Sequence, residues 1–292
     1  MVKMIDSIPE NILKVRDDRE PVYFEKIDGK NANKSAEFQL CEETFHPSWL
    51  QNVTNFDTRI LRERVEPWLT SLFQSEHLSL LAGSGLSVAV SLMATDKVGA
   101  GMGTVKFPIL EEEINAAALS SARAAGRDGV NIEDQIRVAN ELLRGLEILN
   151  KEDESSTLQN KLKETLTNFA NSILAGETAI AEANQNKREE AFNALVTFLM
   201  SFASRTGTRD RVNIFTTNYD RVIEMGAELA GMHLLDRFVG NISPIFRSSR
   251  LNLDMHYNPP GMRGEPRYLE GVARYTKLHG SIDWVQTTDG IR

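Results

Sequence analysis

Three clusters of polar residues each follow a short apolar run in this sequence: residues 83–87 (Gly-Ser-Gly-Leu-Ser), 216–220 (Thr-Thr-Asn-Tyr-Asp) and 279–281 (His-Gly-Ser). The first is typical of a phosphate-binding turn, because glycine lets an anion approach the backbone and the N–H groups of the next helix point at it. The other two contribute an amide, a carboxylate and an imidazole. Histidine, with an ordinary pKa near ~6.5, can accept a proton at neutral pH.

Each cluster also has a plainer interpretation. The glycine turn could simply connect a strand to a helix, Asn218 and Asp220 could cap the helix that follows them, and His279 could be a hydrogen-bonded histidine at a strand end. Their joint position after three expected strands favours a binding site, because ligands of open α/β sheets bind at the carboxyl ends of the strands.

The segments that must position these clusters alternate between strand and helix patterns. Residues 78–82 predict a strand buried on both faces, residues 212–215 a second strand, and residues 275–284 a third strand-like segment. A helix is expected over 221–231, with Gly226 as a minor weakness in it. The pattern predicts an α/β fold with a Rossmann-like parallel sheet.

A long helical segment separates the first two clusters. Apolar residues recur at helical spacing over 111–205, and Asn131 is an expected helix N-cap. Helix breaks are expected near residues 126–129, 152–156 and 185–187. The second glycine cluster, 98–103, follows no apolar strand, so we interpret it as a loop near the first site rather than a dinucleotide fingerprint.

The expected domain organisation has three parts. An N-terminal arm covers 1–57, a Rossmann-like domain consists of 58–110 and 206–292, and a helical insert subdomain covers 111–205. The first segment of the Rossmann-like domain should open with a helix over 58–76. Because an open parallel sheet normally has more strands, we expect the natural polypeptide to continue beyond Arg292.

Composition limits the possible functions. The 292 residues include 41 acidic and 33 basic side chains, a net charge of −8 that argues against direct nucleic-acid binding and against an anionic membrane surface. Cys41 is the only cysteine, so the chain can form neither an internal disulfide nor a cysteine zinc ribbon. With no secretory signal and no apolar run of membrane-spanning length, a cytoplasmic location is expected.

The three clusters together resemble motifs of the sirtuin (SIR2) superfamily. Gly83-Ser84-Gly85-Leu86-Ser87 is similar to the family's Gly-Ala-Gly-x-Ser loop, Thr216-Thr-Asn-Tyr-Asp220 to its Thr-Gln-Asn-Ile-Asp segment, and Leu278-His-Gly280 to its catalytic Leu/Val-His-Gly. The order along the chain is also the same. The resemblance covers residues 77–90 and 211–284 and implies a Rossmann-like fold of SIR2 type.

The chain departs from the protein deacylases of that superfamily. Val88 and the residues after it replace the Gly-Ile-Pro-x-Phe-Arg continuation, and the four zinc cysteines are missing, so no metal site is expected. The motifs are also far apart, with 131 residues from Ser87 to Asn218 and 61 from there to His279. In these respects the chain resembles the bacterial SIR2-like proteins of antiphage defence, which implies an NAD+ hydrolase that depletes NAD.

The resemblance also implies roles for individual residues. Asn218 would bind the nicotinamide ribose or position a water molecule, Asp220 would hold the nicotinamide carboxamide, and His279 would be the general base. The pyrophosphate and its adjacent ribose would be held by the glycine turn, and the expected NAD-binding residues are Gly83, Ser84, Gly85, Ser87, Thr217 and Asp220.

Two other functions stay open at this point: an NAD-dependent protein deacylase, and a non-catalytic sensor of NAD or ADP-ribose. A Rossmann oxidoreductase is less favoured, because no acidic ribose ligand follows the glycine turn at the usual spacing. The resemblance further implies a homo-oligomer and a partner ATPase of HerA type. We expect residues 1–50 and the helical insert to supply those contacts.

Overall fold

The computed structural model describes residues 11–15, 18–27, 37–41, 45–99, 101–204, 210–240, 242–249, 253–257 and 267–292. The chain divides into two compact units, Met1–Leu78 and Ser79–Arg292. This division differs from the expected boundary after residue 57. The reason is that the helix following that residue packs on the N-terminal strands, as described next.

The first unit is a small antiparallel sheet with one helix. Its strands, in the order β1-β2-β3-β4, are β1 (Asn11–Leu13), β2 (Val22–Lys26), β3 (Phe38–Leu40) and β4 (Asn55–Phe56), with a short 3-10 turn at Ser48–Leu50. Helix α1 (Thr58–Phe73) places Ile60 and Leu61 against a core that includes Phe24 and Phe56. The described residues of the expected arm over 1–57 therefore form a folded sheet, and the helix expected in the Rossmann-like domain belongs to this unit.

The second unit is built on a parallel sheet of four strands, as the alternating pattern predicted. The strands, in the order β5-β6-β12-β7, are β5 (Ser79–Ala82), β6 (Val212–Thr216), β12 (Val272–Lys277) and β7 (His233–Leu235). Helix α2 (Ser84–Thr95) follows β5, and α7 (Val222–Leu229) follows β6. The fold is thus mixed α/β and compatible with a Rossmann-like arrangement.

The burial of strand β5 differs from the prediction. It was predicted to be buried on both faces, but Leu81 is 68% exposed and Ala82 is the one buried residue of the strand. The central strand β6 alternates instead, with Val212, Ile214 and Thr216 buried. The third strand ends at Lys277, earlier than the segment expected to run to residue 284.

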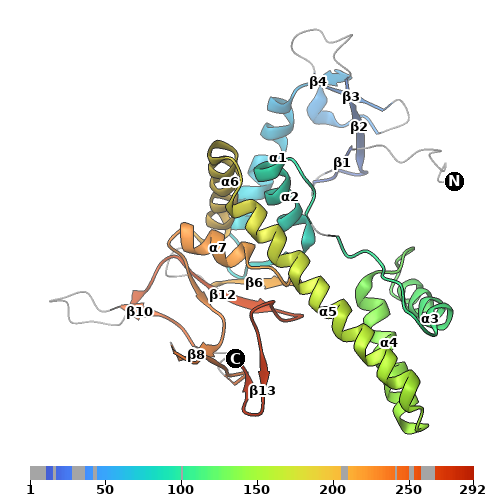
Figure 1. Cartoon of the computed structure of the whole chain (residues 1–292). Coiled ribbons are helices and arrows are strands. Elements are labelled where there is room, and N and C mark those ends of the chain that lie inside the picture. The colour runs from blue at the N-terminus through green and yellow to red at the C-terminus, as the bar shows by residue number, and fades with distance from the viewer. Residues whose placement is uncertain are drawn as a thin grey trace. The chain divides into compact units, whose positions relative to one another are not determined.

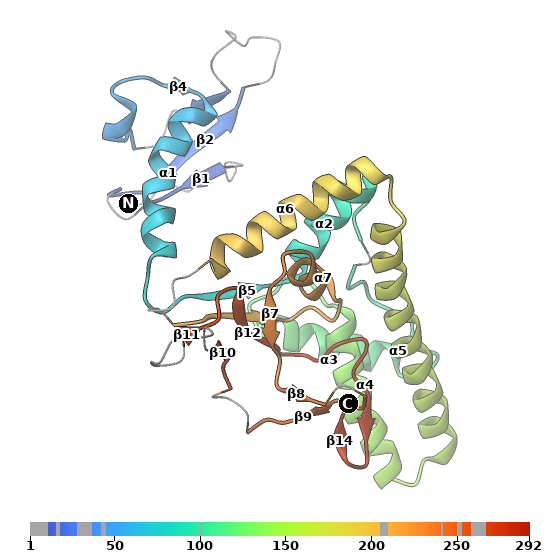
Figure 2. The same ribbon diagram turned by 90° about the vertical axis from the view of Figure 1, so that its left-hand side faces the viewer.

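Helix α6 (Gln185–Ala203) packs against both α2 and α7, so it belongs to the helices beside the sheet (Figure 2). The approach to α7 is close at Gly226, where a Cβ would lie 2.7 Å from Leu195 side-chain carbons. The glycine that seemed a weakness in the sequence is therefore what allows the two helices to approach.

The other helices of the expected insert form a core of their own. They are α3 (Glu111–Ala124), α4 (Ile132–Ile148) and α5 (Glu152–Ala181). Ile114, Val138 and Leu158 are among the buried residues that join them. Helix α5 contacts α4 at one end and α2 at the other, so it connects this group to the sheet domain (Figure 1).

One predicted helix end matches the structure, and another is displaced by a few residues. Asn131 caps α4 as predicted, because its side chain accepts from the backbone N–H of Asp134 at 2.9 Å and Asp134 accepts in return from Asn131. The break expected near 152–156 lies just before that range, at residues 149–151, since α5 begins at Glu152 and the chain turns at Asn150, which has φ 56°. Acidic residues suit a first helical turn, and there they resemble a loop in sequence.

The remaining strands have two residues each and form pairs. They are β8 (Phe238–Val239), β9 (Ile245–Phe246), β10 (His256–Tyr257), β11 (Arg267–Tyr268), β13 (Gln286–Thr287) and β14 (Gly290–Ile291). Trp284 packs on Phe238 and Phe246, with ring centroids 5.1 and 5.7 Å apart. Within the described residues, no helix has both the length and the apolar character needed to cross a membrane.

Candidate active site

The parallel pairing of β5, β6 and β12 brings the three predicted clusters to one edge of the sheet. Backbone bonds continue past the strand ends, where the Thr217 N–H donates to Ala82 O at 3.4 Å and the Leu278 N–H to Thr216 O at 2.8 Å. Segments that are more than 130 residues apart in sequence therefore become neighbours, as the α/β pattern predicted.

Asn218 joins two of these clusters directly. Its Nδ2 donates to Gly83 O at 3.0 Å and to Ser87 Oγ at 2.9 Å, and its backbone N–H donates to Thr216 Oγ1 at 3.1 Å. Because the carbonyl of Gly83 can only accept, the amide orientation is fixed. The Oδ1 atom of Asn218 then has no donor among the described residues and remains an available acceptor.

The hydrogen-bonded chain continues through Ser87 to Asp220. Ser87 Oγ donates to Asp220 Oδ2 at 2.7 Å, and Asp220 Oδ1 accepts from the backbone N–H of Val222 at 3.1 Å. The capping interpretation of Asp220 is therefore also correct, since this bond satisfies a free donor at the start of α7. One carboxylate fixes both the helix start and the hydroxyl of Ser87.

A cavity of about 300 Å³ opens beside this chain of hydrogen bonds. Six of the predicted site residues line it: Ser84, Ser87, Thr217, Asn218, Asp220 and His279. Gly83 and Gly85 do not line it. Gly83 has an ordinary extended backbone with φ −112° and contributes its carbonyl, and a Cβ at Gly85 would meet nothing within 4 Å.

Helices α4 and α5 supply the opposite wall of the cavity. Glu133 from α4 and Phe169 and Glu177 from α5 line it, as do Gly99 and Met102 from the second glycine cluster. That cluster is thus a loop at the first site, as interpreted from the sequence. Among the described residues, the cavity is lined by three carboxylates, Glu133, Glu177 and Asp220, and by the imidazole of His279.

Tyr219 connects the polar edge of the sheet to this helical wall. Its hydroxyl donates to Glu133 Oε1 at 2.7 Å, and its ring meets Phe169 edge-on with centroids 5.5 Å apart. Burial, helped by the bond to Glu133, raises the pKa of Tyr219 well above its ordinary value, so the hydroxyl stays protonated at neutral pH.

His279 lies just after β12 and is 44% exposed, so it is not a buried structural histidine. Its Nδ1 lies 3.6 Å from Glu133 Oε1, and its ring centroid is 6.1 Å from that of Tyr219. The next residue, Gly280, has φ +93°, a conformation that glycine adopts without strain. This turn lets the chain reverse directly after the histidine.

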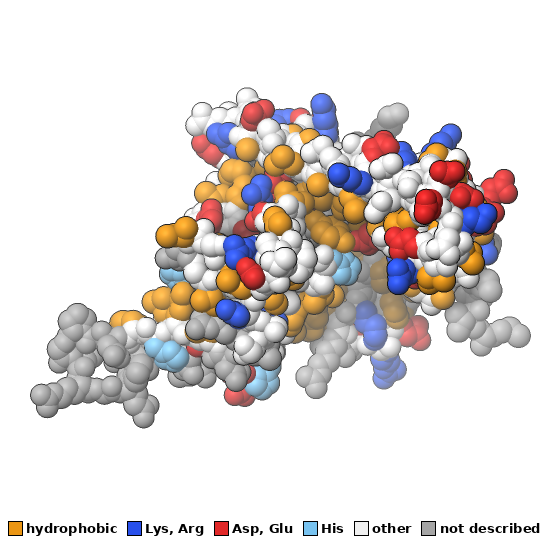
Figure 3. Space-filling model, turned by 60° about the horizontal axis from the view of Figure 1, so that its bottom comes forward, with side chains coloured by type: hydrophobic (Ala, Val, Ile, Leu, Met, Phe, Trp, Pro, Cys, Tyr) orange, Lys and Arg blue, Asp and Glu red, His pale blue; other side chains and the backbone are white. Residues whose placement is uncertain are grey.

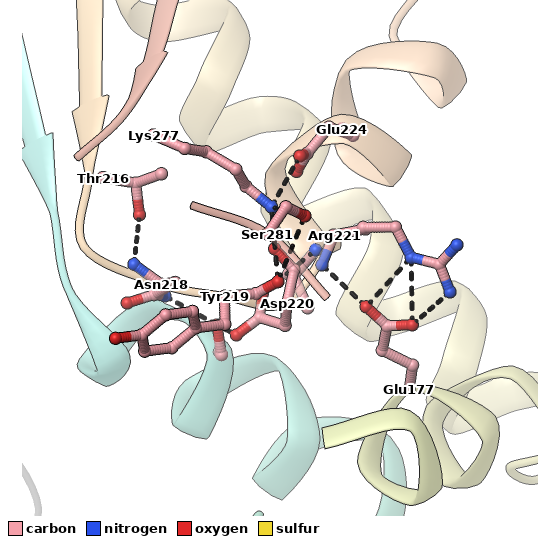
Figure 4. Close-up of polar contacts among 11 residues, drawn as sticks. Glu177, Thr216, Asn218, Tyr219, Asp220, Arg221, Glu224, Lys277 and Ser281 are labelled. Atoms are coloured by element: carbon pink, nitrogen blue, oxygen red, sulfur yellow. Dashed lines mark hydrogen bonds and ion pairs between the residues drawn. The ribbon is translucent and has the colours of Figure 1, made fainter. Parts of the chain in front are cut away.

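A second contact ties the helical wall to the same loop. The guanidinium and backbone N–H of Arg221 both donate to the Glu177 carboxylate of α5, the backbone bond measuring 2.7 Å (Figure 4). Tyr219 and Arg221, which flank Asp220 in one loop, are thus held by α4 and α5 respectively. The three residues that sequence reasoning missed are Glu133, Glu177 and Tyr219. Only Tyr219 lies inside a motif that could have indicated it.

Lys277 contacts both site loops, the one that carries Asn218 and the one that carries His279, through hydrogen bonds. Its side chain is 1% exposed, and its Nζ donates to Asp220 O at 2.6 Å, to Ser281 Oγ at 2.8 Å and to Glu224 Oε1 at 2.8 Å (Figure 4). Burial raises the pKa of Glu224 above its ordinary value, and the Lys277 ammonium opposes that shift. One buried cation therefore links the loop of Asn218 to the loop of His279.

The described residues contain no group of three or more His, Cys, Asp or Glu side chains that could hold a metal ion. On the face drawn in Figure 3, lysine and arginine side chains are interspersed with aspartate and glutamate, as on an ordinary solvated surface.

No family model and no curated protein matches this chain.

Proposed function

We propose that this protein is an NAD+ hydrolase with a SIR2-type site, which cleaves the bond between nicotinamide and ribose. The observation that carries the proposal is the hydrogen-bonded chain from Gly83 through Asn218 and Ser87 to Asp220, beside a cavity that His279 also lines. These groups come from the three motifs that resemble the sirtuin superfamily.

The charge of the cavity suits the reacting end of NAD+. The nicotinamide nitrogen carries a positive charge in the substrate, and during cleavage that charge moves to an oxocarbenium-like ribose while neutral nicotinamide leaves. Of the lining carboxylates, Glu177 is paired with Arg221 and Glu133 faces Tyr219 and His279, so Asp220 is the one placed to stabilise a cation in both states. A cavity of about 300 Å³ is at the small end of ligand pockets, so it fits the nicotinamide riboside part, with the phosphates toward the start of α2.

The reaction requires little acid catalysis, because the leaving group is neutral. The C1′–N bond breaks with its electron pair passing to nicotinamide, and a water molecule then adds to C1′ and loses a proton to His279. Asn218 Oδ1, which has no donor among the described residues, accepts from a ribose hydroxyl and orients the sugar. The α4–α5 wall limits the access of bulk water.

The setting of this activity follows from the same resemblance. Uncontrolled NAD+ cleavage would kill the host cell, so the enzyme acts in antiphage defence in the cytoplasm, as a homo-oligomer or with a partner ATPase of HerA type, and is restrained when alone. The alternatives are an NAD-dependent protein deacylase and a sensor that binds NAD or ADP-ribose without turnover.

Product analysis tests the proposal. Purified protein, alone and with the product of its neighbouring gene, is incubated with NAD+, and nicotinamide and ADP-ribose are quantified by chromatography. We expect equal amounts of both products without any peptide. Release that requires an acylated peptide would show a deacylase, and saturable NAD+ binding without release under either condition would show a sensor.

A further inference from the structure

We propose that Glu133 is a positioning residue that fixes the tautomer of His279, with the hydrogen on Nδ1 and the lone pair on Nε2. The catalytic consequence rests on the proposed NAD+ hydrolysis, but the tautomer itself does not. The starting observation is that Nδ1, not Nε2, is the ring nitrogen next to a carboxylate, 3.6 Å from Glu133 Oε1.

Glu133 is held in place from two sides. Its Oε1 accepts from the hydroxyl of Tyr219 at 2.7 Å, and Tyr219 is itself packed on Phe169. Glu133 also lies in the first turn of α4, next to the reciprocal cap formed by Asn131 and Asp134. The carboxylate is therefore a fixed acceptor at the cavity wall.

The chemistry of the contact decides which nitrogen carries the hydrogen. A carboxylate can only accept, so the imidazole nitrogen that faces it is stabilised as N–H, and the other nitrogen keeps its lone pair. Free histidine prefers the opposite tautomer, with its hydrogen on Nε2. Glu133 thus reverses the intrinsic preference and makes Nε2 the atom that can take a proton from water.

Glu133 is a positioning residue rather than a catalytic residue, because it affects the reaction only through His279. Oriented carboxylate–histidine pairs of this kind set the basicity and direction of the reacting nitrogen in other sites. Because 3.6 Å is longer than a hydrogen bond, we expect the contact to shorten when a ligand fills the cavity.

Nitrogen NMR of the imidazole rings tests the tautomer without any assay of activity. The chain has five histidines, and His279→Ala identifies the signals of residue 279. At a pH where the imidazoles are neutral, we expect His279 to show hydrogen on Nδ1 in the parent protein. Glu133→Gln keeps an acceptor for Tyr219 but removes the negative charge that stabilises Nδ1–H, so the intrinsic preference should return and His279 should change to the Nε2–H form.

The matched control is Glu141→Gln, the same change on the same helix at a side chain that is 66% exposed and pairs with Arg137. It should leave the His279 signals unchanged. Hydrogen on Nε2 in the parent protein, or an unchanged Nδ1–H form in Glu133→Gln, would overturn the inference whether or not the protein cleaves NAD+.

Kinetics then separate this inference from the proposed function. If the parent protein releases nicotinamide, Glu133→Gln should lower kcat roughly 10- to 100-fold with little change in KM, and Glu141→Gln should match the parent. A parent protein that is inactive under all conditions contradicts the proposed function and leaves the NMR result to decide the tautomer. An active parent with an equally active Glu133→Gln variant refutes the positioning role alone.

Discussion

Two cavities open at the same carboxyl edge of the parallel sheet, and they differ in how their polar groups are used. The larger, of about 300 Å³, holds Asn218 and His279, whose Oδ1 atom and half-exposed ring remain open to a ligand. The smaller, of about 120 Å³, is lined by Lys277 and Glu224, whose charges are paired with each other. The comparison contrasts polar groups that are left open with charges that are paired inside the protein.

The paired charges of the smaller cavity nevertheless affect the larger cavity. Lys277 Nζ donates to the backbone carbonyl of Asp220 and to the hydroxyl of Ser281, so this residue of the ion pair also holds both site loops. A buried ion pair is weak evidence for stability in itself, but removing one partner is costly because the other charge is left unpaired. Mutations should therefore affect activity alone in the larger cavity and both stability and activity in the smaller one.

The largest expected effect is on catalysis. His279→Ala should lower NAD+ cleavage by roughly 10²- to 10⁴-fold through loss of the base, and Asn218→Ala should cost a similar order through loss of ribose orientation. The double variant should be little worse than the worse single variant, since both residues act on one transition state. Turnover and the thermal midpoint are measured together. A normally folded His279→Ala protein with the parent rate would refute the assignment.

The next effect is on stability. Lys277→Met leaves the Glu224 carboxylate without its partner and should lower the free energy of unfolding by about 3–5 kcal/mol in urea denaturation. Adding Glu224→Gln should restore part of that stability, because the unpaired charge is removed, but not the turnover, because the Asp220 carbonyl still lacks its donor. Full recovery of both would show that Lys277 does not position the site.

A smaller effect tests the helices beside the sheet. Gly226→Ala should destabilise the protein by about 1–3 kcal/mol, because the new Cβ would overlap Leu195. The control is Gly145→Ala in α4, where a Cβ meets nothing within 4 Å, so this change should stabilise by roughly 0.5–1 kcal/mol. Equal thermal midpoints for the two variants would contradict the close approach of α6 and α7.

The smallest effect concerns the start of α4, which positions Glu133. The hydrogen bond from the Arg127 guanidinium holds the pKa of Asp134 below its ordinary value of 3.8. The charged form is therefore favoured on folding, and its contribution is present above pH ~4 and lost as the pH falls through the lowered pKa.

Asp134→Asn should accordingly cost roughly 0.5 kcal/mol at pH 7, the size expected of a partly exposed ion pair. The difference in unfolding free energy between parent and variant should vanish in the acid range. Denaturation measured across pH 2–7 checks this, and a difference that stays constant to pH 2 would exclude the ion pair as its source.

The sequence predicted the secondary-structure elements whose apolar residues recur at a regular spacing. The strand at 212–215 and the helix at 58–76 were predicted from apolar spacing and correspond to β6 and α1, and the Asn131 cap was predicted from residue type. The sequence did not predict strands that are too short to show a pattern. The strands of the first unit have two to five residues each, too few for a period to be visible between polar loops.

The candidate site was predictable only where motif and strand end coincide. The sequence placed Ser87, Asn218 and Asp220 at one edge, and the hydrogen bonds join them. Glu133 and Glu177 gave no signal, because their role depends on how α4 and α5 pack against the sheet domain, and helix periodicity carries no information on that packing. Gly226 was misjudged for the same reason.

The most direct test of the account is where NAD+ binds. A crystal structure of the His279→Ala variant soaked with NAD+ should show the nicotinamide riboside in the larger cavity, with a ribose hydroxyl within ~3 Å of Asn218 Oδ1. NAD+ bound elsewhere, or an empty cavity at saturating NAD+, would contradict the claim that this edge of the sheet is an NAD+-cleaving site.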